Sequence, residues 1–277
     1  MLQRMKAKTI LVTGATDGIG RETARQLLEL GHRVLVHGRS RDKAERIALR
    51  LAKASERGAA LPVWGELSLM REVVELARQV RSQCRVLDVL INNAGVLENR
   101  RRFTTDGFEM TMAVNHFAPF LLTRLLLDLV EAAPAGRIVT VSSTVHASGS
   151  LDFGAPSFLP MGGGYSGHEA YSTSKLANVL FTAELARRLD GTKVTANCLH
   201  PGVIDTKLLH AGFAIKGSPV EEGARTSVFL ATSAAVAGVT GKYYDNCREK
   251  PCSAKGRDQA LARALWQATD AALAAFL

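Results

Sequence analysis

The chain has 277 residues, of which 47% are hydrophobic and 22% are charged, and its formal net charge is +9. This composition is typical of a globular protein with a sizeable core, and the length suits one large domain or two small ones. The positive charge could attract nucleic acid, but the basic residues are scattered, and the one tight run, 100–102, has few aromatic residues near it. We therefore expect no nucleic-acid binding, and a small anionic ligand explains part of the charge.

The cysteines and the N-terminus exclude several other classes of protein. Four cysteines occur, none in a C-x-x-C pair, so we expect free thiols in a reducing compartment and no metal site. The first residues, MLQRMKAKTILVTG, contain too short an apolar run for a signal peptide. No uncharged apolar stretch reaches the length of about 18 residues that a transmembrane helix needs. The sequence predicts a soluble, cytoplasmic protein without a transmembrane segment.

Short apolar runs alternate with longer amphipathic stretches along the whole chain. The expected strands are 9–13, 33–37, 60–64, 86–91, 137–143, 193–199 and 242–245. The expected helices are 18–30, 41–54, 68–82, 106–132, 171–190, 219–232 and 257–275. Strands that are apolar on both faces favour a parallel sheet, and their alternation with helices predicts an α/β protein. We expect one domain over 1–277, a Rossmann fold with a doubly wound parallel sheet of about seven strands and helices on both faces.

Two irregular or apolar segments allow more than one interpretation. The stretch 144–170 is rich in Gly, Ser and Pro, and we expect an ordered loop beside the functional site, with a second such loop near 203–218. The last segment, 257–275, has an apolar stripe at helical spacing. A helix packed on the core is favoured for it over a helix on a membrane surface, because its polar face is not rich in lysine.

The first strand ends in a glycine-rich turn that opens a helix, in the sequence TILVTGATDGIG (9–20). Glycines let a pyrophosphate approach the backbone, and the N-terminus of the following helix offers free N–H groups. The spacing is G-x-x-x-G-x-G, and a tight turn alone can also require glycine. Strand, turn and helix together predict a dinucleotide site that includes Gly14, Thr16, Asp17, Gly18, Ile19 and Gly20.

The end of the second strand indicates which dinucleotide binds. An acidic residue at this place would bind the ribose 2′-hydroxyl of NAD, but the sequence has Arg39, Ser40 and Arg41. Arginine can pair with a 2′-phosphate through two hydrogen bonds. NADP(H) is therefore favoured over NAD(H), although the same residues could form a solvated loop.

A tyrosine and a lysine stand four residues apart in HEAYSTSKLANVL (168–180). Residues at this spacing share one face of a helix, so Tyr171 and Lys175 can point at one ligand. A phenol has an ordinary pKa of about 10, and an adjacent ammonium favours the phenolate and lowers that value. The pair could be a catalytic acid/base, or it could be a chance pair on an exposed helix.

Several separated motifs occur in one order along the chain: TGATDGIG (13–20), NNAG (92–95), Asn115 in MAVNHFAPFLLT, VSS (141–143), YSTSK (171–175) and PGVIDT (201–206). With these motifs the sequence resembles the short-chain dehydrogenase/reductase family. DGFEM, VNHFAPFLLT, SKLANVLFTAEL and GKYYDNCREK resemble its retinol-dehydrogenase-like branch.

The resemblance implies roles for particular residues. Tyr171 and Lys175 match the catalytic pair, Ser143 the catalytic serine with Ser142 as the alternative, and Asn115 the asparagine that holds a water in a proton relay. The remaining matches lie along the cofactor, which Tyr171 and Lys175 also contact: Glu66, Leu67, Asn93, Ala94, Gly95, Pro201, Gly202, Val203 and Thr206. Glu66 departs from the family's usual Asp, and 28 residues separate Ser143 from Tyr171 (171 − 143), an insertion like that of the retinol-dehydrogenase-like branch.

The function implied is an NADP-dependent short-chain dehydrogenase/reductase that transfers a hydride between nicotinamide and a carbonyl or alcohol. We expect a small lipophilic substrate, retinal-like or another aldehyde or ketone, because apolar residues of the two loops could line its pocket. These residues are Leu151, Phe153, Phe158, Leu159, Met161, Leu208, Leu209, Phe213 and Ile215. The alternatives are a non-catalytic NADP-binding sensor or scaffold and a sugar-nucleotide epimerase, and a hydrolase is not expected because no G-x-S-x-G elbow occurs. The family also implies a homodimer or homotetramer that pairs through 106–132 and 171–190.

Overall fold

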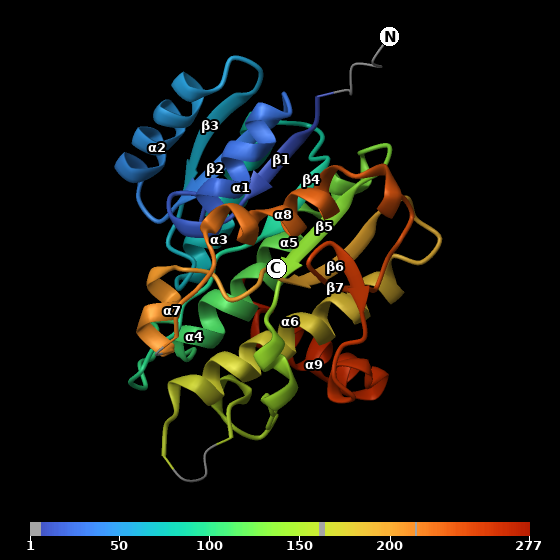
Figure 1. Ribbon diagram of the computed structural model, residues 1–277. Coiled ribbons are helices and arrows are strands. Elements are labelled where there is room, and N and C mark those ends of the chain that lie inside the picture. The colour runs from blue at the N-terminus through green and yellow to red at the C-terminus, as the bar shows by residue number, and fades with distance from the viewer. Residues whose placement is uncertain (1–6, 161–163, 214) are drawn as a thin grey trace.

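The computed structural model describes residues 7–160, 164–213 and 215–277, and these form an α/β domain around one sheet (Figure 1). In the described residues the sheet has eight strands in the order β3-β2-β1-β4-β5-β6-β7-β8. The first seven strands run parallel, and β8 pairs antiparallel with β7. The strands are β1 (Thr9–Val12), β2 (Arg33–Gly38), β3 (Ala59–Trp64), β4 (Val89–Asn92), β5 (Arg137–Val141), β6 (Thr195–His200), β7 (Tyr243–Asp245) and β8 (Arg248–Lys250).

Helices cover both faces of the sheet, as expected for a doubly wound fold. On one face lie α1 (Gly18–Glu29), α2 (Arg41–Ala54) and α8 (Val220–Thr232). On the other lie α3 (Met70–Gln83), α5 (Ala118–Glu131) and α6 (Gly167–Arg188), with α9 (Gln259–Ala272) packed outside α6. Figure 1 shows α1 and α8 in front of the sheet and α3 and α5 behind it. The predicted fold class is confirmed.

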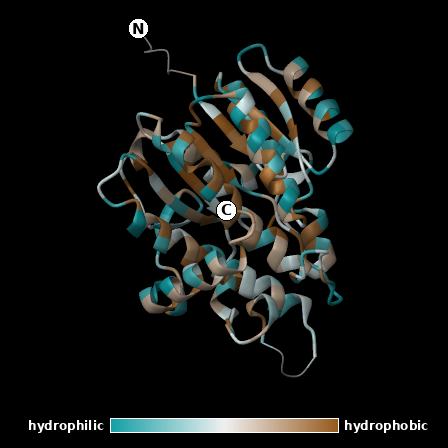
Figure 2. Ribbon diagram, turned by 180° about the vertical axis from the view of Figure 1, so that it is seen from behind, coloured by the Kyte–Doolittle hydropathy of each residue, from teal (hydrophilic) through white to brown (hydrophobic). Residues whose placement is uncertain are grey.

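The core consists of two apolar layers, one between each sheet face and its helices. All residues of β4, β5 and β6 are buried, which explains why β4 and β5 are mainly apolar without strict alternation. Figure 2 shows the strands as mainly hydrophobic and the hydrophilic residues on the outer sides of the helices. The buried strands therefore form a stable sheet, and the site lies at the carboxyl ends of these strands.

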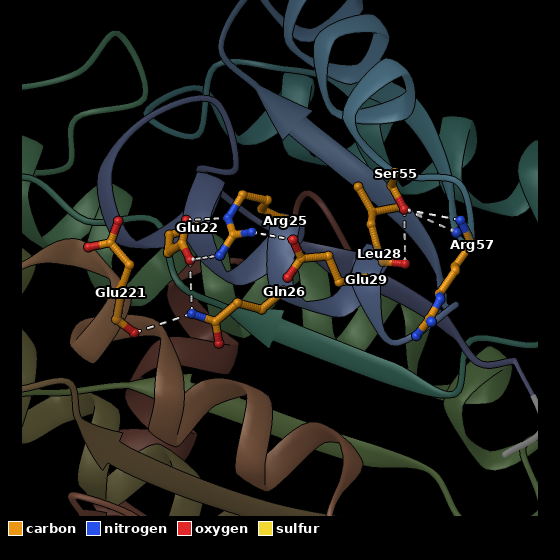
Figure 3. Close-up of polar contacts among 9 residues, drawn as sticks. Glu22, Arg25, Gln26, Leu28, Glu29, Ser55, Arg57 and Glu221 are labelled. Carbon is orange, nitrogen blue, oxygen red and sulfur yellow. Dashed lines mark hydrogen bonds and ion pairs between the residues drawn. The ribbon is translucent and has the colours of Figure 1, made fainter.

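A polar network fixes α1 beside α8 (Figure 3). The buried Glu22 carboxylate accepts hydrogen bonds from Arg25 at 2.8 and 2.7 Å and from the Gln26 amide at 2.9 Å. Gln26 also donates to the backbone carbonyl of Glu221, at the start of α8, at 3.2 Å. Hydrogen bonds to a charged carboxylate are stronger than neutral ones, so this network orients the helix whose N-terminus faces the glycine turn.

The chain order places a crevice at the middle of the sheet. β1 pairs with β2 on one side and with β4 on the other, so the connections that follow β1 and β4 diverge to opposite faces. In open α/β sheets a ligand binds outside the carboxyl ends of the strands at such a switch point. This is where the structure brings the glycine turn and the 92–95 motif together.

Several predicted elements differ from the structure in their bounds, and one strand was not predicted. The helix expected from residue 106 begins with α4 (Met110–Met112) and passes through a π-helical turn, Ala113–Phe117, before α5. The helix expected from residue 171 begins at Gly167, because Ser166 accepts a hydrogen bond from the backbone N–H of Glu169 and caps it. The short strand β8 is formed by polar, exposed residues and has no apolar signal.

Two helices bear on the membrane expectations. The segment Met110–Glu131 is long and apolar enough to cross a membrane by length and composition, but 78% of its most apolar window is buried inside the fold. α9 packs against α5 and α6, as expected for the C-terminal segment. Its Trp266 stacks on Phe181 with ring centroids 5.9 Å apart and lies 4.7 Å from the ring of Phe120.

Candidate active site

A cavity of about 1010 Å³ opens along the carboxyl ends of the central strands. It brings together nearly all residues that the sequence predicted from separate motifs. From the predicted set the walls contain Gly14, Thr16, Asp17, Gly18, Ile19, Gly20, Arg39, Glu66, Leu67, Asn93, Ala94, Gly95, Ser143, Tyr171, Lys175, Pro201, Gly202, Val203 and Thr206. Ser40, Arg41 and Asn115 do not line it. Its lining residues follow β1 and β2 at one end and β5 and β6 at the other.

The glycine turn has the geometry of a backbone cradle. Gly14 has a φ of +66°, a region that favours glycine, and a Cβ on Gly20 would lie 2.4 Å from both Asn93 Nδ2 and the Gly14 carbonyl oxygen. The Asn93 amide donates to the Thr13 carbonyl at 2.8 Å and so ties this turn to the end of β4. Any larger side chain at Gly20 would break this contact. The turn and the N-terminus of α1 fit a pyrophosphate, which needs free backbone N–H groups.

The other end of the cavity has a positive charge, but not the full set that the sequence predicted. Arg39 and Lys43 line the cavity. Arg41 instead pairs with Glu45 at 2.7 Å and lies over the Trp64 ring, 5.2 Å from its centroid, so it does not line the cavity. The sequence analysis missed Lys43, which lies in the first turn of α2, two residues after Arg41, and so points to a different side of that helix.

Tyr171 and Lys175 lie one turn apart on the buried face of α6 and both line the cavity. The Lys175 Nζ donates to the Val141 carbonyl at 3.0 Å and lies 5.4 Å from the centroid of the Tyr171 ring. Both side chains are buried, so the pair is not a chance pair on an exposed helix. The 3.6-residue period of the helix thus delivers the predicted juxtaposition.

The electrostatics of this pair differ from the expectation. Burial lowers the pKa of Lys175 to about 8, and burial raises the pKa of Tyr171. The expected lowering of the phenol pKa is therefore not seen, because burial disfavours the phenolate. The phenol keeps its proton, which is the form that can donate to a substrate oxygen.

The structure separates the two candidate serines at the end of β5. Ser143 lies half-buried in the cavity wall, and its Oγ is held only by a long contact of 3.4 Å from the Val145 N–H. Ser142 is buried, and its hydroxyl donates to the Lys175 carbonyl at 2.8 Å. Ser143 is thus free to donate to a ligand, while Ser142 is committed to the helix that carries the lysine.

Asn115 lies behind the cavity wall in the π-helical turn. Its amide nitrogen donates to the Val96 carbonyl and to Ser174 Oγ, both at 2.9 Å, and its oxygen accepts from the Val96 N–H at 2.8 Å. A Cβ on Gly95 would lie 3.4 Å from Asn115 Oδ1 and 3.5 Å from Lys175 Nζ, so the three residues meet. π-helical turns are common at functional sites, and this one turns the asparagine toward the lysine.

The apolar residues expected around a substrate divide into two groups. Leu208, Leu209, Phe213 and Ile215, in and after α7 (Lys207–Gly212), line the cavity, and the Phe213 ring meets the Tyr171 ring edge-on at 6.4 Å. Phe158 and Leu159 are buried in the core instead, with Leu151 packed against it, and Phe153 contacts Phe158, so their predicted place in the pocket is wrong. Met161 lies outside the described residues. Val96, Met110 and Val145 complete the apolar wall and were not expected.

The comparisons with known proteins agree with this geometry. The model of the family described as short chain dehydrogenase matches residues 8–155 and 161–214. The chain belongs to the short-chain dehydrogenase family, and it is an oxidoreductase of that family. It is 42% identical to human retinol dehydrogenase 14 over 96% of this chain and 86% of that protein, and 38% identical to human retinol dehydrogenase 13 over 94% and 82%. The predicted resemblance to the retinol-dehydrogenase-like branch is confirmed.

Solved structures share the fold over almost its whole length. An uncharacterized protein from Mycobacterium Paratuberculosis superposes with a TM-score of 0.77 at 31% identity, over 96% of this chain and 92% of that one. A short chain dehydrogenase from Escherichia coli CFT073, complexed with NADPH, superposes with a TM-score of 0.72 at 25% identity, over 87% and 97%.

Proposed function

We propose that this chain is an NADP-dependent oxidoreductase that interconverts a lipophilic carbonyl compound and its alcohol. The observation that carries the proposal is the meeting of Tyr171, Lys175 and Ser143 at one end of a cavity whose other end holds Arg39 and Lys43. Bound there, the reduced cofactor supplies a hydride to the substrate carbonyl carbon. The glycine cradle fits its pyrophosphate, and the two cations fit a 2′-phosphate.

The side chains of the site supply the charge stabilisation and the proton that hydride transfer to a carbonyl also requires. As negative charge develops on the carbonyl oxygen, Ser143 Oγ and the Tyr171 hydroxyl stabilise it by hydrogen bonds. Tyr171 then gives its proton to that oxygen, and in the oxidative direction it takes the proton back. Lys175 lies beside the phenol and stabilises the phenolate that remains. Asn115 keeps one lone pair of Oδ1 for a water that could resupply the proton through Lys175.

The cofactor preference has a direct test with a matched control. Arg39→Ala and Lys43→Ala should each weaken NADPH binding by on the order of 10- to 100-fold, since each removes a charge-assisted contact, and should leave NADH binding unchanged. Arg41→Ala should change neither, because that side chain faces Glu45 and Trp64. Nicotinamide fluorescence titrations measure both affinities. Equal binding of NADPH and NADH by the unchanged chain would contradict the preference.

The substrate class follows from the apolar wall that α7 contributes above Tyr171. We propose an aldehyde or ketone with a long apolar portion, retinaldehyde among them, and the relatives named retinol dehydrogenases support this choice. A set of carbonyl compounds graded by apolar length, assayed by loss of NADPH absorbance, tests it. Turnover of small polar sugars or hydroxy acids alone would contradict it, and NADPH binding without any turnover would favour the alternative of a non-catalytic sensor or scaffold.

We further propose a soluble, cytoplasmic location and a homodimer or homotetramer that pairs through surfaces other than the face that α9 covers. α9 packs on the faces of α5 and α6 through which pairing was expected, so that face meets its own chain. Fractionation of cells and light scattering of the purified protein test these two points separately.

A further inference from the structure

Two buried histidines lie at opposite ends of β2, and one of them contacts the glycine turn. His37, the fifth residue of β2, is 1% exposed and lies at the carboxyl end of the strand. His32 precedes the strand at its amino end and is fully buried. Neither residue contributes to the motifs that define the family resemblance.

The His37 ring joins two turns at the edge of the cavity. Its Nδ1 lies 3.0 Å from the backbone nitrogen of Gly14 and accepts that N–H, and its Nε2 lies 3.0 Å from the carbonyl oxygen of Gly65 and donates to it. The His37 backbone carbonyl also accepts the N–H of Ala15 at 2.8 Å. Two successive N–H groups of the glycine turn are therefore held by one residue of the neighbouring strand.

These contacts specify the protonation state of the ring. Since Gly14 has only an N–H to offer, Nδ1 must be the bare nitrogen, and since Gly65 offers a carbonyl, Nε2 must carry the hydrogen. Burial lowers the pKa of His37 to about 4, so the neutral ring that this arrangement needs is present at neutral pH. The ring is thus a fixed bridge, with one acceptor and one donor.

The bridge adds to the contact of Asn93 with the Thr13 carbonyl and fixes the first residue of the turn. Gly14 is half-buried at positive φ, just past the end of β1, and the His37 ring is the acceptor for its N–H. A flexible turn would have to be ordered by the cofactor itself, at a cost to affinity. A turn already held by His37 avoids that cost.

We propose that His37 is a positioning residue for the dinucleotide, holding the Gly14–Ala15 backbone in the shape that receives the pyrophosphate. The proposal rests on the function proposed above, because it presumes a dinucleotide in the cavity. It differs from the role of Arg39 in one respect: the turn serves NADPH and NADH alike, whereas Arg39 serves only the 2′-phosphate.

The test compares three variants by fluorescence titration with NADPH and with NADH. His37→Leu, which removes both contacts at similar volume, should weaken both cofactors by the same factor, on the order of tenfold. His37→Gln, whose amide offers an acceptor and a donor, should recover most of the affinity. His32→Leu is the matched control: it removes a buried histidine that accepts the Lys8 N–H at 3.3 Å at the far end of the same strand, and should lower the melting temperature without changing either affinity.

The outcomes separate this inference from the proposed function. Unchanged cofactor affinity in His37→Leu, with the unchanged chain binding NADPH, would overturn the inference alone. Equal loss of affinity in His37→Leu and His32→Leu would also overturn it, because general destabilisation would then explain the effect. Absence of NADPH and NADH binding by the unchanged chain would overturn the proposed function, and the inference with it. If His37→Leu does not fold, His37→Ala and His32→Ala replace the two leucine variants, and a loss of affinity for both cofactors in His37→Ala alone is then the expected result, while unchanged affinity would overturn the inference.

Discussion

The role of a side chain in this site depends on whether its polar group is already hydrogen-bonded within the protein. Ser143 and Ser142 are adjacent in the chain, yet one hydroxyl faces the cavity and the other is bonded to the Lys175 carbonyl. The motif VSS cannot distinguish them, because alternation along a strand places one serine on each side but does not say which side the ligand occupies. The structure favours Ser143, in line with the resemblance.

These two serines give a matched pair of variants. Ser143→Ala should lower kcat/KM for carbonyl reduction by about 100-fold, the effect of losing one donor to a developing oxyanion, and leave the melting temperature unchanged. Ser142→Ala should remove the second hydrogen bond to the Lys175 carbonyl, which keeps its helical partner, and cost about 0.5–1.5 kcal/mol of stability. Steady-state kinetics and thermal unfolding of both variants measure the two effects. The reverse distribution of effects would assign the catalytic role to Ser142.

Charges near the cofactor show what the sequence could and could not predict at this scale. The arginines after β2 correctly indicated a basic end of the cavity, but the residue that shares it with Arg39 is Lys43, not Arg41. Within α2, Arg41 and Lys43 are two residues apart and therefore point to different sides of the helix, and only Lys43 lines the cavity. The contact of His37 with Gly14 had no sequence signal at all, because it depends on the register of β2 against β1.

At the scale of elements, α9 packs on α6 and covers a side of it that would otherwise be exposed. α6 is buried almost all round, so it has no amphipathic stripe, and its sequence alone could not show which helices surround it. α9 covers it, and the Arg188 guanidinium lies 4.3 Å from the centroid of the Trp266 ring. The buried Thr269 also bonds His116 at 2.9 Å, which ties α9 to the π-helical turn that contains Asn115.

This packing predicts that α9 is part of the folded core. Trp266→Ala should cost about 3–5 kcal/mol, the usual loss for a large aromatic removed from a core, whereas Gln267→Ala, on the exposed side of the same helix, should be close to neutral. Denaturant unfolding of the two variants measures the difference. Equal, small effects would mean that α9 is a peripheral attachment and that the α5–α6 face is open to a partner.

The loop before α6 shows why its sequence did not predict whether its apolar residues line the pocket or pack into the core. The Tyr165 hydroxyl donates to Glu109 Oε1 at 2.8 Å, and the Ser157 hydroxyl accepts the Glu109 N–H at 2.7 Å, so a buried carboxylate anchors the loop to α4. Ser157 and Phe158 have φ values of 54° and 62°, which turn the Phe158 ring into the core beside Phe117. Apolar residues in such a loop can pack inward or line a pocket, and composition does not distinguish the two.

Across the whole molecule, buried neutral histidines link stability to pH. Burial lowers the pKa of five of them, to about 4 for His37 and about 3 for His116; the others are His32, His146 and His200. An unfolded histidine titrates near pH 6.5. Below that pH the histidines are protonated in the unfolded chain but remain neutral in the folded chain. The free energy of unfolding therefore falls as the pH falls.

The resulting prediction is a melting temperature that declines steadily as the pH falls from about 6.5 toward 4. His116→Leu should reduce the slope of that decline by removing one of the five groups. His168→Leu, at an exposed position, should leave it unchanged. Thermal unfolding across this range measures the slopes, and a chain equally stable at pH 5 and pH 7 would contradict the assignment of neutral buried rings.

The central claim is that Tyr171 is the proton donor of an NADPH-dependent carbonyl reduction. The measurement that tests it most directly is single-turnover reduction of retinaldehyde by preformed enzyme–NADPH complex, comparing the unchanged chain with Tyr171→Phe. We predict unchanged NADPH affinity in the variant and a transfer rate lower by about 10²–10⁴, because the phenyl ring keeps the packing but has no proton to give. A variant that binds NADPH and transfers hydride at the full rate would contradict the account.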